Sequence, residues 1–301
     1  MAVATAVGAG VALAALALGL PAALAWGFTH PPRRRHRRTP RAVGLVFERV
    51  RLRARDGVRL SAWYVPPPPV PVTPRGVIIV CHGYWGNRAE MLPHACFLHH
   101  AGYAVLLLDF RAHGWSGGRM ATFGLTETLD VQAALDWVED HPDLAGLPLA
   151  LLGESMGASV SLLTAAQDPR VRAVVSDAAF ARFDSAVAAR LRLLFGRLAE
   201  PVIAPTRSVG ERLLGVRSTD IAPEDAIAGI APRPVFLIHG LEDRLLVPEH
   251  SRRLLRAAAP GGHATLWEVA GAGHVASIRV APDEYARRVL AFLNDALAGP
   301  E

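Results

Sequence analysis

One serine of the chain lies in a segment whose spacing is typical of a catalytic nucleophile. Residues 153–157 read G-E-S-M-G, which matches the pattern G-x-S-x-G, and they follow an apolar run at residues 149–152. Small and apolar residues come next, so the serine would occupy a sharp turn between a strand and a helix. Glycines on either side remove side chains that would obstruct such a turn. The pattern therefore predicts that Ser155 presents its hydroxyl for attack on an acyl carbonyl.

A serine hydroxyl needs a base to remove its proton, and the base needs an acid to hold it. Asp243 and His274 each follow one of the last two apolar runs of the chain, at the expected carboxyl end of a strand. The chain order of serine, acid and histidine is one that serine hydrolases use. We predict Ser155, Asp243 and His274 as the catalytic residues. Glu242 and Asp177 are alternatives for the acid.

The oxyanion that forms when the serine attacks must be stabilised by N–H donors already in position. The amide of Met156 is the first expected donor, because it directly follows the nucleophile. The second is expected in the loop at residues 81–87, after another apolar run. We predict the Tyr84 amide, with the Trp85 amide as the alternative.

Other polar residues near strand ends are interpreted as structural. His274 is better placed as the base than His82 or His239, so both of these are expected to brace loops. Arg111 and His113 are expected to support the loops around them in the same way.

The composition excludes several enzyme classes. All 32 basic residues are arginine, which rules out a lysine nucleophile, a Schiff base and the lysine of a phosphate-binding P-loop. Two cysteines are too few for a disulfide scaffold, and 51% apolar content excludes a disordered chain. The predicted mechanism needs neither a metal ion nor an organic cofactor, and none is predicted.

Short apolar runs alternate with helical patterns along most of the chain. A hairpin is expected at residues 47–65, with its turn at Asp56-Gly57. The later strands are expected at residues 77–80, 104–108, 149–152, 171–175, 235–238 and 264–269. The intervening helices are expected at residues 87–101, 126–140, 156–167, 248–259 and 282–297. Nearly continuous Val, Ile and Leu indicate strands buried on both faces, hence a parallel sheet in a doubly wound α/β domain.

With these motifs, residues 45–298 resemble the α/β-hydrolase superfamily. Three segments carry the resemblance: H-G-Y-W-G-N at 82–87, D-F-R-A-H-G-W-S at 109–116 and H-G-L-E-D at 239–243. They are similar to segments of single-span, membrane-anchored bacterial α/β hydrolases related to the prolyl-oligopeptidase-like group. The resemblance implies a mostly parallel, eight-stranded sheet with helices on both faces, and Ser-Asp-His acyl transfer. Oligopeptidases of that kind carry an N-terminal propeller, whereas only about 40 residues precede the expected hydrolase body here, so an ester hydrolase is expected rather than a peptidase.

Residues 180–230 interrupt the alternation and are expected to form a cap or lid. Apolar residues there recur at helical spacing, opposite several arginines. The apolar residues are Val187, Leu191, Leu194, Phe195 and Leu198, and the arginines are Arg190, Arg192 and Arg197. Packing on the sheet and covering of the substrate both explain this helix. A basic amphipathic helix could also lie against acidic lipid headgroups.

The N-terminus is expected to be a membrane anchor. Residues 2–28 contain no ionisable side chain, which exceeds the roughly 20 residues that cross a bilayer. We predict a transmembrane helix at residues 1–28, an arginine-rich linker at 29–44 and the hydrolase domain at 45–301. A cleaved signal peptide, with a small-x-small site at residues 23–25, is the alternative.

The net charge of +5 is unevenly distributed. Residues 33–59 hold 11 arginines and two acids, whereas residues 60–301 hold 21 arginines and 25 acids. The basic run follows the predicted span directly, so it favours a single-pass protein with its catalytic domain on the cytoplasmic face. It lacks the interleaved aromatic residues that would stack on bases, and no nucleic-acid partner is predicted.

We therefore expect a membrane-anchored serine hydrolase that cleaves acyl esters. A small-molecule acyl ester is the expected substrate, and membrane lipid around residues 2–28 is the expected partner, with no obligate protein partner. A peptidase or an acyltransferase could use the same three residues. A membrane-tethered binding protein without turnover is the alternative from another class.

Overall fold

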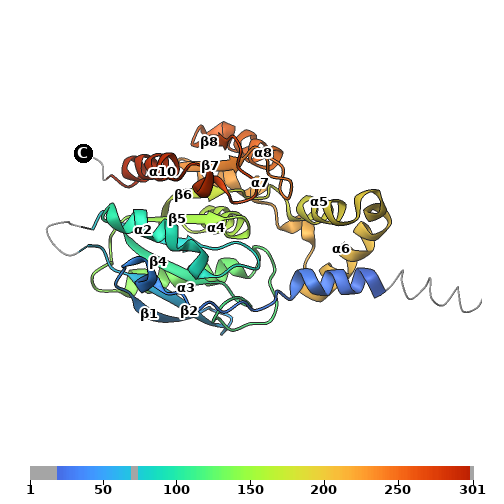
Figure 1. Cartoon of the computed structure of the whole chain (residues 1–301), viewed down its shortest axis with the longest axis horizontal. Coiled ribbons are helices and arrows are strands. Elements are labelled where there is room, and N and C mark those ends of the chain that lie inside the picture. The colour runs from blue at the N-terminus through green and yellow to red at the C-terminus, as the bar shows by residue number, and fades with distance from the viewer. Residues whose placement is uncertain (1–18, 69–73, 299–301) are drawn as a thin grey trace, which may run out of the picture.

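The computed structural model describes residues 19–68 and 74–298, and its central feature is one eight-stranded sheet (Figure 1). The strand order is β1-β2-β4-β3-β5-β6-β7-β8. The strand β2 pairs antiparallel with β1 and with β4, and all other neighbours are parallel. The strands are β1 (Glu48–Arg53), β2 (Arg59–Val65), β3 (Val77–Cys81), β4 (Ala104–Asp109), β5 (Leu149–Glu154), β6 (Val171–Asp177), β7 (Val235–Gly240) and β8 (Ala264–Val269). The predicted α/β-hydrolase fold with a mostly parallel sheet is confirmed.

Helices cover both faces of the sheet. The α-helices are α2 (Leu92–His100), α3 (Glu127–Asp140), α4 (Met156–Gln167), α5 (Phe183–Phe195), α6 (Glu200–Leu214), α7 (Pro223–Ala226), α8 (Glu249–Ala258), α9 (Ser277–Val280) and α10 (Pro282–Leu297). The 3-10 helices are η1 (Pro40–Val43), η2 (Arg88–Met91), η3 (Gly196–Ala199), η4 (Ser218–Asp220), η5 (Ile227–Ile230) and η6 (Ala259–Gly261). Side chains of α3, α4 and α8 share one apolar core with the sheet, and those of α2 and α10 share the other.

The strand β3 shows why the apolar runs become central strands. All five of its residues are buried, and successive side chains point to opposite faces. Ile78 and Val80 pack in the core beneath α2 and α10, whereas Val77 and Ile79 pack in the core beneath α3 and α4. A strand with no solvent-facing side must be apolar at every position.

The predicted hairpin at the start of the sheet is also confirmed. Its turn is closed by a hydrogen bond of 2.8 Å from the Gly57 N–H to the Ala54 carbonyl oxygen. Gly57 has a φ of +87°, which glycine adopts without a steric penalty.

The first helix differs from its expected bounds. Residues 88–91 form the 3-10 helix η2, and α2 begins at Leu92, one residue before Pro93. Asn87 caps this segment, because its side-chain oxygen accepts the Ala89 N–H at 2.9 Å.

The predicted membrane span falls mostly outside the described residues. Residues 1–18 are not described, and residues 19–29 are helical. Between residues 19 and 298, leaving out 69–73, none of the helices has both the length and the apolar character to cross a membrane.

The segment predicted as a cap forms its own group of helices between β6 and β7. It contains α5, η3, α6, η4, α7 and η5. Figure 1 shows α5 and α6 beyond the end of the sheet, on the same side as the helical residues 19–29. Phe183 and Leu191 are buried, but Leu194 and Leu198 are exposed, so the apolar face of this segment is only partly covered.

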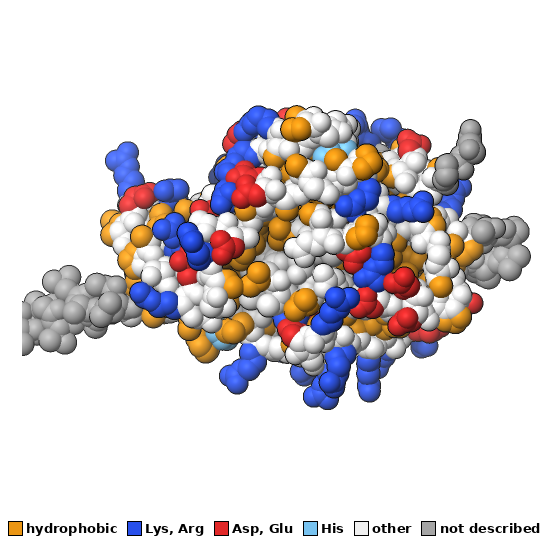
Figure 2. All heavy atoms as spheres, turned by 180° about the vertical axis from the view of Figure 1, so that it is seen from behind, with side chains coloured by type: hydrophobic (Ala, Val, Ile, Leu, Met, Phe, Trp, Pro, Cys, Tyr) orange, Lys and Arg blue, Asp and Glu red, His pale blue; other side chains and the backbone are white. Residues whose placement is uncertain are grey.

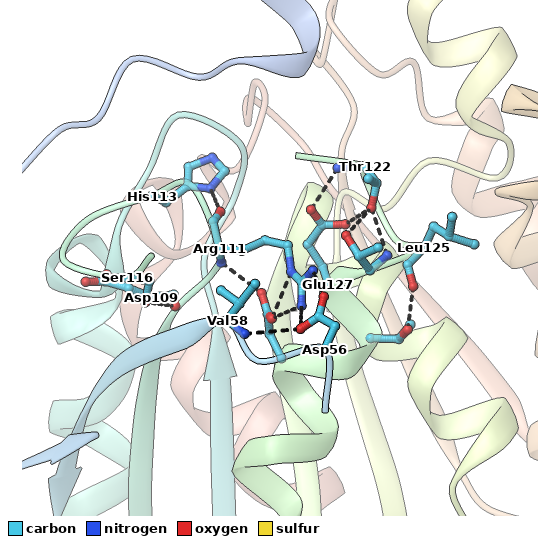
Figure 3. A network of polar contacts seen from close by, with 12 residues as sticks. Asp56, Val58, Asp109, Arg111, His113, Ser116, Thr122, Leu125 and Glu127 are labelled. Atoms are coloured by element: carbon cyan, nitrogen blue, oxygen red, sulfur yellow. Dashed lines mark hydrogen bonds and ion pairs between the residues drawn. The ribbon is translucent and has the colours of Figure 1, made fainter. Parts of the chain in front are cut away.

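A buried arginine holds the loop after β4 in place. Arg111 donates from Nε and Nη2 to Oδ1 of Asp130 at 2.9 and 2.6 Å, and from its backbone N–H to Oδ2 at 2.8 Å. Its Nη1 lies 2.5 Å from Oδ2 of Asp56, toward which Figure 3 shows the side chain directed. Because Asp130 is on α3 and Asp56 in the β1–β2 turn, one side chain ties three segments together. The structural role expected for Arg111 is confirmed.

We expect Arg111→Met to lower the free energy of unfolding by about 3–5 kcal/mol, because it leaves the buried Asp130 carboxylate without its partner. Urea unfolding measures the loss. Adding Asp130→Leu should restore much of it, since no buried charge then remains. Arg252→Met, which breaks an exposed ion pair with Glu268, is the control. A loss no larger than that of the control would contradict this account.

Candidate active site

Ser155 lies on a strained turn between β5 and α4. Its backbone has a φ of +52° and a ψ of −116°, a conformation that residues other than glycine rarely adopt. The Ser155 N–H donates to the Asp177 carbonyl oxygen at 2.8 Å, which holds the turn against β6. A side chain at Gly153 would collide with the carbonyl group of Gly157, and one at Gly157 with the Cys81 carbonyl. The glycines are therefore required by close backbone approach, and the predicted strand–turn–helix context is present.

The three residues predicted to carry the chemistry lie within hydrogen-bond distance of one another. Nε2 of His274 is 2.9 Å from Oγ of Ser155, and Nδ1 of His274 is 2.7 Å from Oδ2 of Asp243. The Asp243 side chain is fully buried, whereas that of His274 is one-fifth exposed. With Nδ1–H donating to the carboxylate, Nε2 is free to accept the serine proton.

The carboxylate of Asp243 is held in its charged form. Its Oδ1 accepts the N–H groups of Leu245 and Leu246 at 2.8 and 2.9 Å. Burial by itself would raise the pKa of Asp243, but hydrogen bonds from His239 and His274 outweigh it and hold the pKa well below its ordinary value. An ionised Asp243 can orient the imidazole and stabilise its protonated form.

The two alternative acids lie elsewhere. Glu242 is exposed, although it is the neighbour of Asp243 in the chain. Asp177 is buried behind the serine, where its Oδ1 accepts a hydrogen bond from Ser277 at 3.3 Å. The carboxylate that contacts His274 is that of Asp243.

The loop after β3 passes directly beside the serine. A Cβ added at Gly83 would lie 3.3 Å from Cβ of Ser155. Tyr84 and Met156, the two predicted oxyanion donors, line the same cavity as Ser155. The alternative donor, the Trp85 N–H, is directed instead at Nε2 of His113, at 3.3 Å. This arrangement favours the Tyr84 amide over that of Trp85.

Two buried histidines brace this loop. Nδ1 of His82 is 2.8 Å from the Gly83 carbonyl oxygen, and its Nε2 accepts the Phe110 N–H at 3.1 Å. Nδ1 of His113 is 2.8 Å from the Arg111 carbonyl oxygen. Burial lowers the pKa of both histidines to about 4, so both are neutral at neutral pH. The structural interpretation of His82 and His113 is confirmed.

A third histidine supports the loop that carries the acid. Nε2 of His239 donates to the Leu246 carbonyl oxygen at 2.7 Å, and Nδ1 is 2.6 Å from Oγ of Ser251. His239 therefore fixes the residues whose amides bind Asp243, and its structural interpretation is confirmed.

A buried acidic pair behind the serine was not predicted from the sequence. The Glu154 carboxylate lies 3.4 Å from Nε2 of His94, and burial raises its pKa well above the ordinary value. Burial also raises the pKa of Asp177, to about 7. Both residues lie at the ends of strands that continue beyond the apolar runs. Because their side chains are polar, the sequence pattern did not indicate that the strands reach this far.

A largely apolar cavity of about 330 Å³ leads to Ser155 and His274. The helix α5 forms one wall, with Phe183, Val187 and Leu194 among its lining residues. The helical residues 19–29 form another wall. This wall could not be predicted, because the apolar side chains of these residues suit a membrane span equally well. Tyr84 fixes this second wall by donating from Oη to the Phe28 carbonyl oxygen at 2.7 Å.

The described residues include no group of three or more His, Cys, Asp or Glu side chains that could hold a metal ion.

The chain is similar to proteins of one hydrolase family. A family model described as serine aminopeptidase, S33, matches residues 72–229. The uncharacterized protein Rv2307c of Mycobacterium tuberculosis is 32% identical over 221 residues, which cover 73% of this chain and 69% of that protein. The uncharacterized protein YfhR of Escherichia coli O157:H7 is 30% identical over 214 residues, which cover 70% of this chain and 68% of that protein.

Solved structures share the fold. The esterase Pf2001 of Pyrococcus furiosus superimposes with a TM-score of 0.72 at 29% identity, covering 89% of this chain and all of that one. An acylaminoacyl peptidase of Pyrococcus horikoshii superimposes with a TM-score of 0.65 at 17% identity, over 85% of this chain and 43% of that one. The second likeness extends to the fold alone.

The buried neutral histidines predict loss of stability in acid. Burial lowers the pKa of His82, His113 and His250 to about 4, and that of His94 to about 3, from an ordinary 6.5. Between pH 6.5 and 4 the unfolded chain binds these protons and the folded chain does not. The free energy of unfolding is therefore highest above pH 6.5. It decreases as the pH is lowered from 6.5 to 4, by about 1.4 kcal/mol per pH unit for each histidine.

The variant His113→Gln tests this expectation. Urea unfolding between pH 6 and 5 should give a slope that is smaller than that of the wild type by about 1.4 kcal/mol per pH unit. Above pH 7.5 the stability curves of the two proteins should run parallel. Equal slopes in acid would contradict a buried, neutral His113.

Proposed function

The chain belongs to the serine aminopeptidase S33 family of hydrolases with the α/β-hydrolase fold, and we propose that it cleaves carboxylic esters through Ser155, Asp243 and His274. The relay of two contacts carries this proposal: 2.7 Å between Asp243 and His274, and 2.9 Å between His274 and Ser155. A surface serine without a base has no comparable path for its proton.

In the proposed reaction, Nε2 of His274 takes the proton from Ser155 as Oγ attacks the ester carbonyl. The N–H groups of Met156 and Tyr84 donate to the oxyanion of the tetrahedral intermediate. When this collapses, the ester C–O bond breaks and His274 returns the proton to the leaving alcohol. Water then attacks the acyl-enzyme with His274 as base, releasing the acid and restoring the serine.

The lining of the cavity favours an ester over a peptide with a free amino terminus. An aminopeptidase must bind the ammonium group of its substrate, which calls for an acidic side chain near the nucleophile. Among the described residues that line the cavity, none is Asp or Glu, and the charged side chain present is that of Arg190. The likeness to the Pyrococcus furiosus esterase also supports this choice.

The same proposal includes the location of the protein. The part of the predicted span at residues 2–28 that precedes the cavity wall would anchor the chain in a membrane, with the catalytic domain on the cytoplasmic face. Support comes from the absence of ionisable side chains before residue 29 and from the arginine run at residues 33–38.

Replacing the nucleophile tests the function directly. We expect Ser155→Ala to abolish hydrolysis of a short-chain nitrophenyl ester and to abolish labelling by a fluorophosphonate probe. Labelling of this variant at the wild-type intensity would contradict the assignment of Ser155.

Replacing the acid tests the relay. Asp243→Asn should lower kcat by about 10⁴-fold, because the amide no longer holds His274 in the tautomer that accepts the serine proton. Glu242→Gln, at the neighbouring exposed carboxylate, is the matched control and should keep kcat within about twofold. Comparable losses in the two variants would show that Asp243 does not hold the base.

The location has its own test. Fractionation of cells that express the full chain should recover the protein with membranes. Protease added outside intact cells should leave the catalytic domain undigested. It should digest this domain once the membrane has been opened and the cytoplasmic face is accessible. A soluble secreted product that lacks residues 1–25 would contradict the anchored arrangement and favour a cleaved signal peptide.

A further inference from the structure

The helical residues 19–29 are a fixed part of the catalytic domain. Tyr84 donates from Oη to the carbonyl oxygens of Gly27 and Phe28, and the Ala121 N–H donates to that of Thr29 at 2.8 Å. Leu24 and Phe28 pack against the main apolar core. This helix therefore contributes to the shape of the cavity as a wall, and is not a free linker.

The outer side of this helix and the neighbouring cap expose a group of large apolar side chains. Trp26 is 53% exposed and Leu198 is 79% exposed. The whole group, here named the apolar corner, comprises Leu20, Trp26, Leu193, Leu194, Phe195 and Leu198. Figure 1 places the helix beside α5 and α6 at one end of the molecule, and Figure 2 shows apolar and basic side chains at that end. Exposed apolar side chains gathered at one end of a molecule mark an interaction surface.

The cavity and the apolar corner share a residue. Leu194 is 52% exposed and also lines the cavity that reaches Ser155. On the opposite wall, Ala23 and Leu24 line the cavity, and Leu20 lies one helical turn before Leu24. An acyl chain can therefore pass from the apolar corner to the serine along a continuous apolar surface.

The sequence beyond the apolar corner indicates what covers it. Residues 2–18 lead directly into the helix and contain no ionisable side chain. The cap adds basic residues close to the exposed leucines, among them Arg190 at the cavity wall and Arg197 in η3. An apolar surface bordered by arginines and continued by an uncharged stretch suits a bilayer with anionic headgroups.

We propose that the apolar corner docks on the lipid bilayer and that the substrate, given the ester hydrolysis proposed above, is the long-chain acyl ester of a membrane lipid. The acyl chain enters between residues 19–29 and α5, and its carbonyl reaches Ser155. The alcohol leaves with the proton taken from Ser155, and water then supplies the second oxygen of the released fatty acid and restores the serine proton. The reaction therefore needs no further reactant.

Docking can be measured without any catalytic activity. The full chain carrying Cys96→Ser and Leu198→Cys, labelled with a polarity-sensitive fluorophore, is inserted into phosphatidylcholine–phosphatidylglycerol vesicles with brominated acyl chains. We expect at least about twofold quenching at position 198. The exposed Val46, labelled through Val46→Cys, is the matched control and should not be quenched.

An unquenched label at position 198 in the inserted protein would overturn the docking. Disulfide cross-linking of two chains through the Leu198→Cys variant, without quenching, would do the same and would identify the apolar corner as a contact between protein copies.

The substrate class is tested by a ratio of rates. The rate on methylumbelliferyl oleate in vesicles is divided by the rate on soluble methylumbelliferyl butyrate. We expect Leu193→Glu combined with Leu198→Glu to lower this ratio by about tenfold or more, because charged side chains oppose contact with the acyl region. Val46→Glu adds a charge at an exposed valine away from the cap and should leave the ratio unchanged.

The outcomes separate the two proposals. Hydrolysis of both esters with an unchanged ratio in the Leu193→Glu, Leu198→Glu variant would overturn the lipid substrate and leave the esterase proposal intact. Hydrolysis of neither ester, together with no fluorophosphonate labelling, would overturn the esterase proposal and the substrate class with it. The quenching experiment would then still decide whether the apolar corner docks.

Discussion

The strained backbone of Ser155 is the constraint on which the site depends. A φ of +52° is held by close packing of Gly157 against Cys81 and by the hydrogen bond to the Asp177 carbonyl. These contacts come from β3 and β6, the two strands that flank β5. The hydroxyl is therefore positioned by the three central strands of the sheet. Because the strain is borne by buried strands, it persists without help from a ligand.

The polar side chains around the serine divide into groups that remain charged and groups that remain neutral. Asp243 keeps its charge through two backbone amides and two histidines. His82 and His113 are kept neutral by burial, and each uses both ring nitrogens to hold a backbone group. Neutral braces add no positive charge beside His274. Asp243 is the carboxylate in hydrogen-bond contact with the imidazole, whereas Asp177, whose pKa burial raises to about 7, acts on it only through its charge.

The sequence sufficed to predict which three side chains of the candidate site meet, because the relevant signals are local. Ser155, Asp243 and His274 each follow an apolar run, and parallel strands bring their carboxyl ends to one edge of the sheet. The cavity was beyond such reasoning, because helical spacing in α5 does not reveal which apolar residues find a partner. Leu191 is buried, whereas Leu194, one turn later, is half exposed. The apolar residues 19–28 fit lipid and protein equally well, and only their contacts distinguish the two.

Those contacts restrict how the domain can sit on a membrane. Ala23, Leu24, Gly27 and Phe28 line the cavity, so this part of the helix cannot also cross the hydrocarbon region. If the chain is anchored, the crossing is left to residues 2–22, and to 2–18 if the described helix lies wholly outside it. The stretch 2–18 has 17 residues, which is at the lower limit of the roughly 17–25 that cross a bilayer. The arginine-rich segment at residues 29–44 follows the fixed helix in the chain. It would therefore run along the surface of the catalytic domain. An anchored enzyme of this geometry must hold the mouth of its cavity at the bilayer surface.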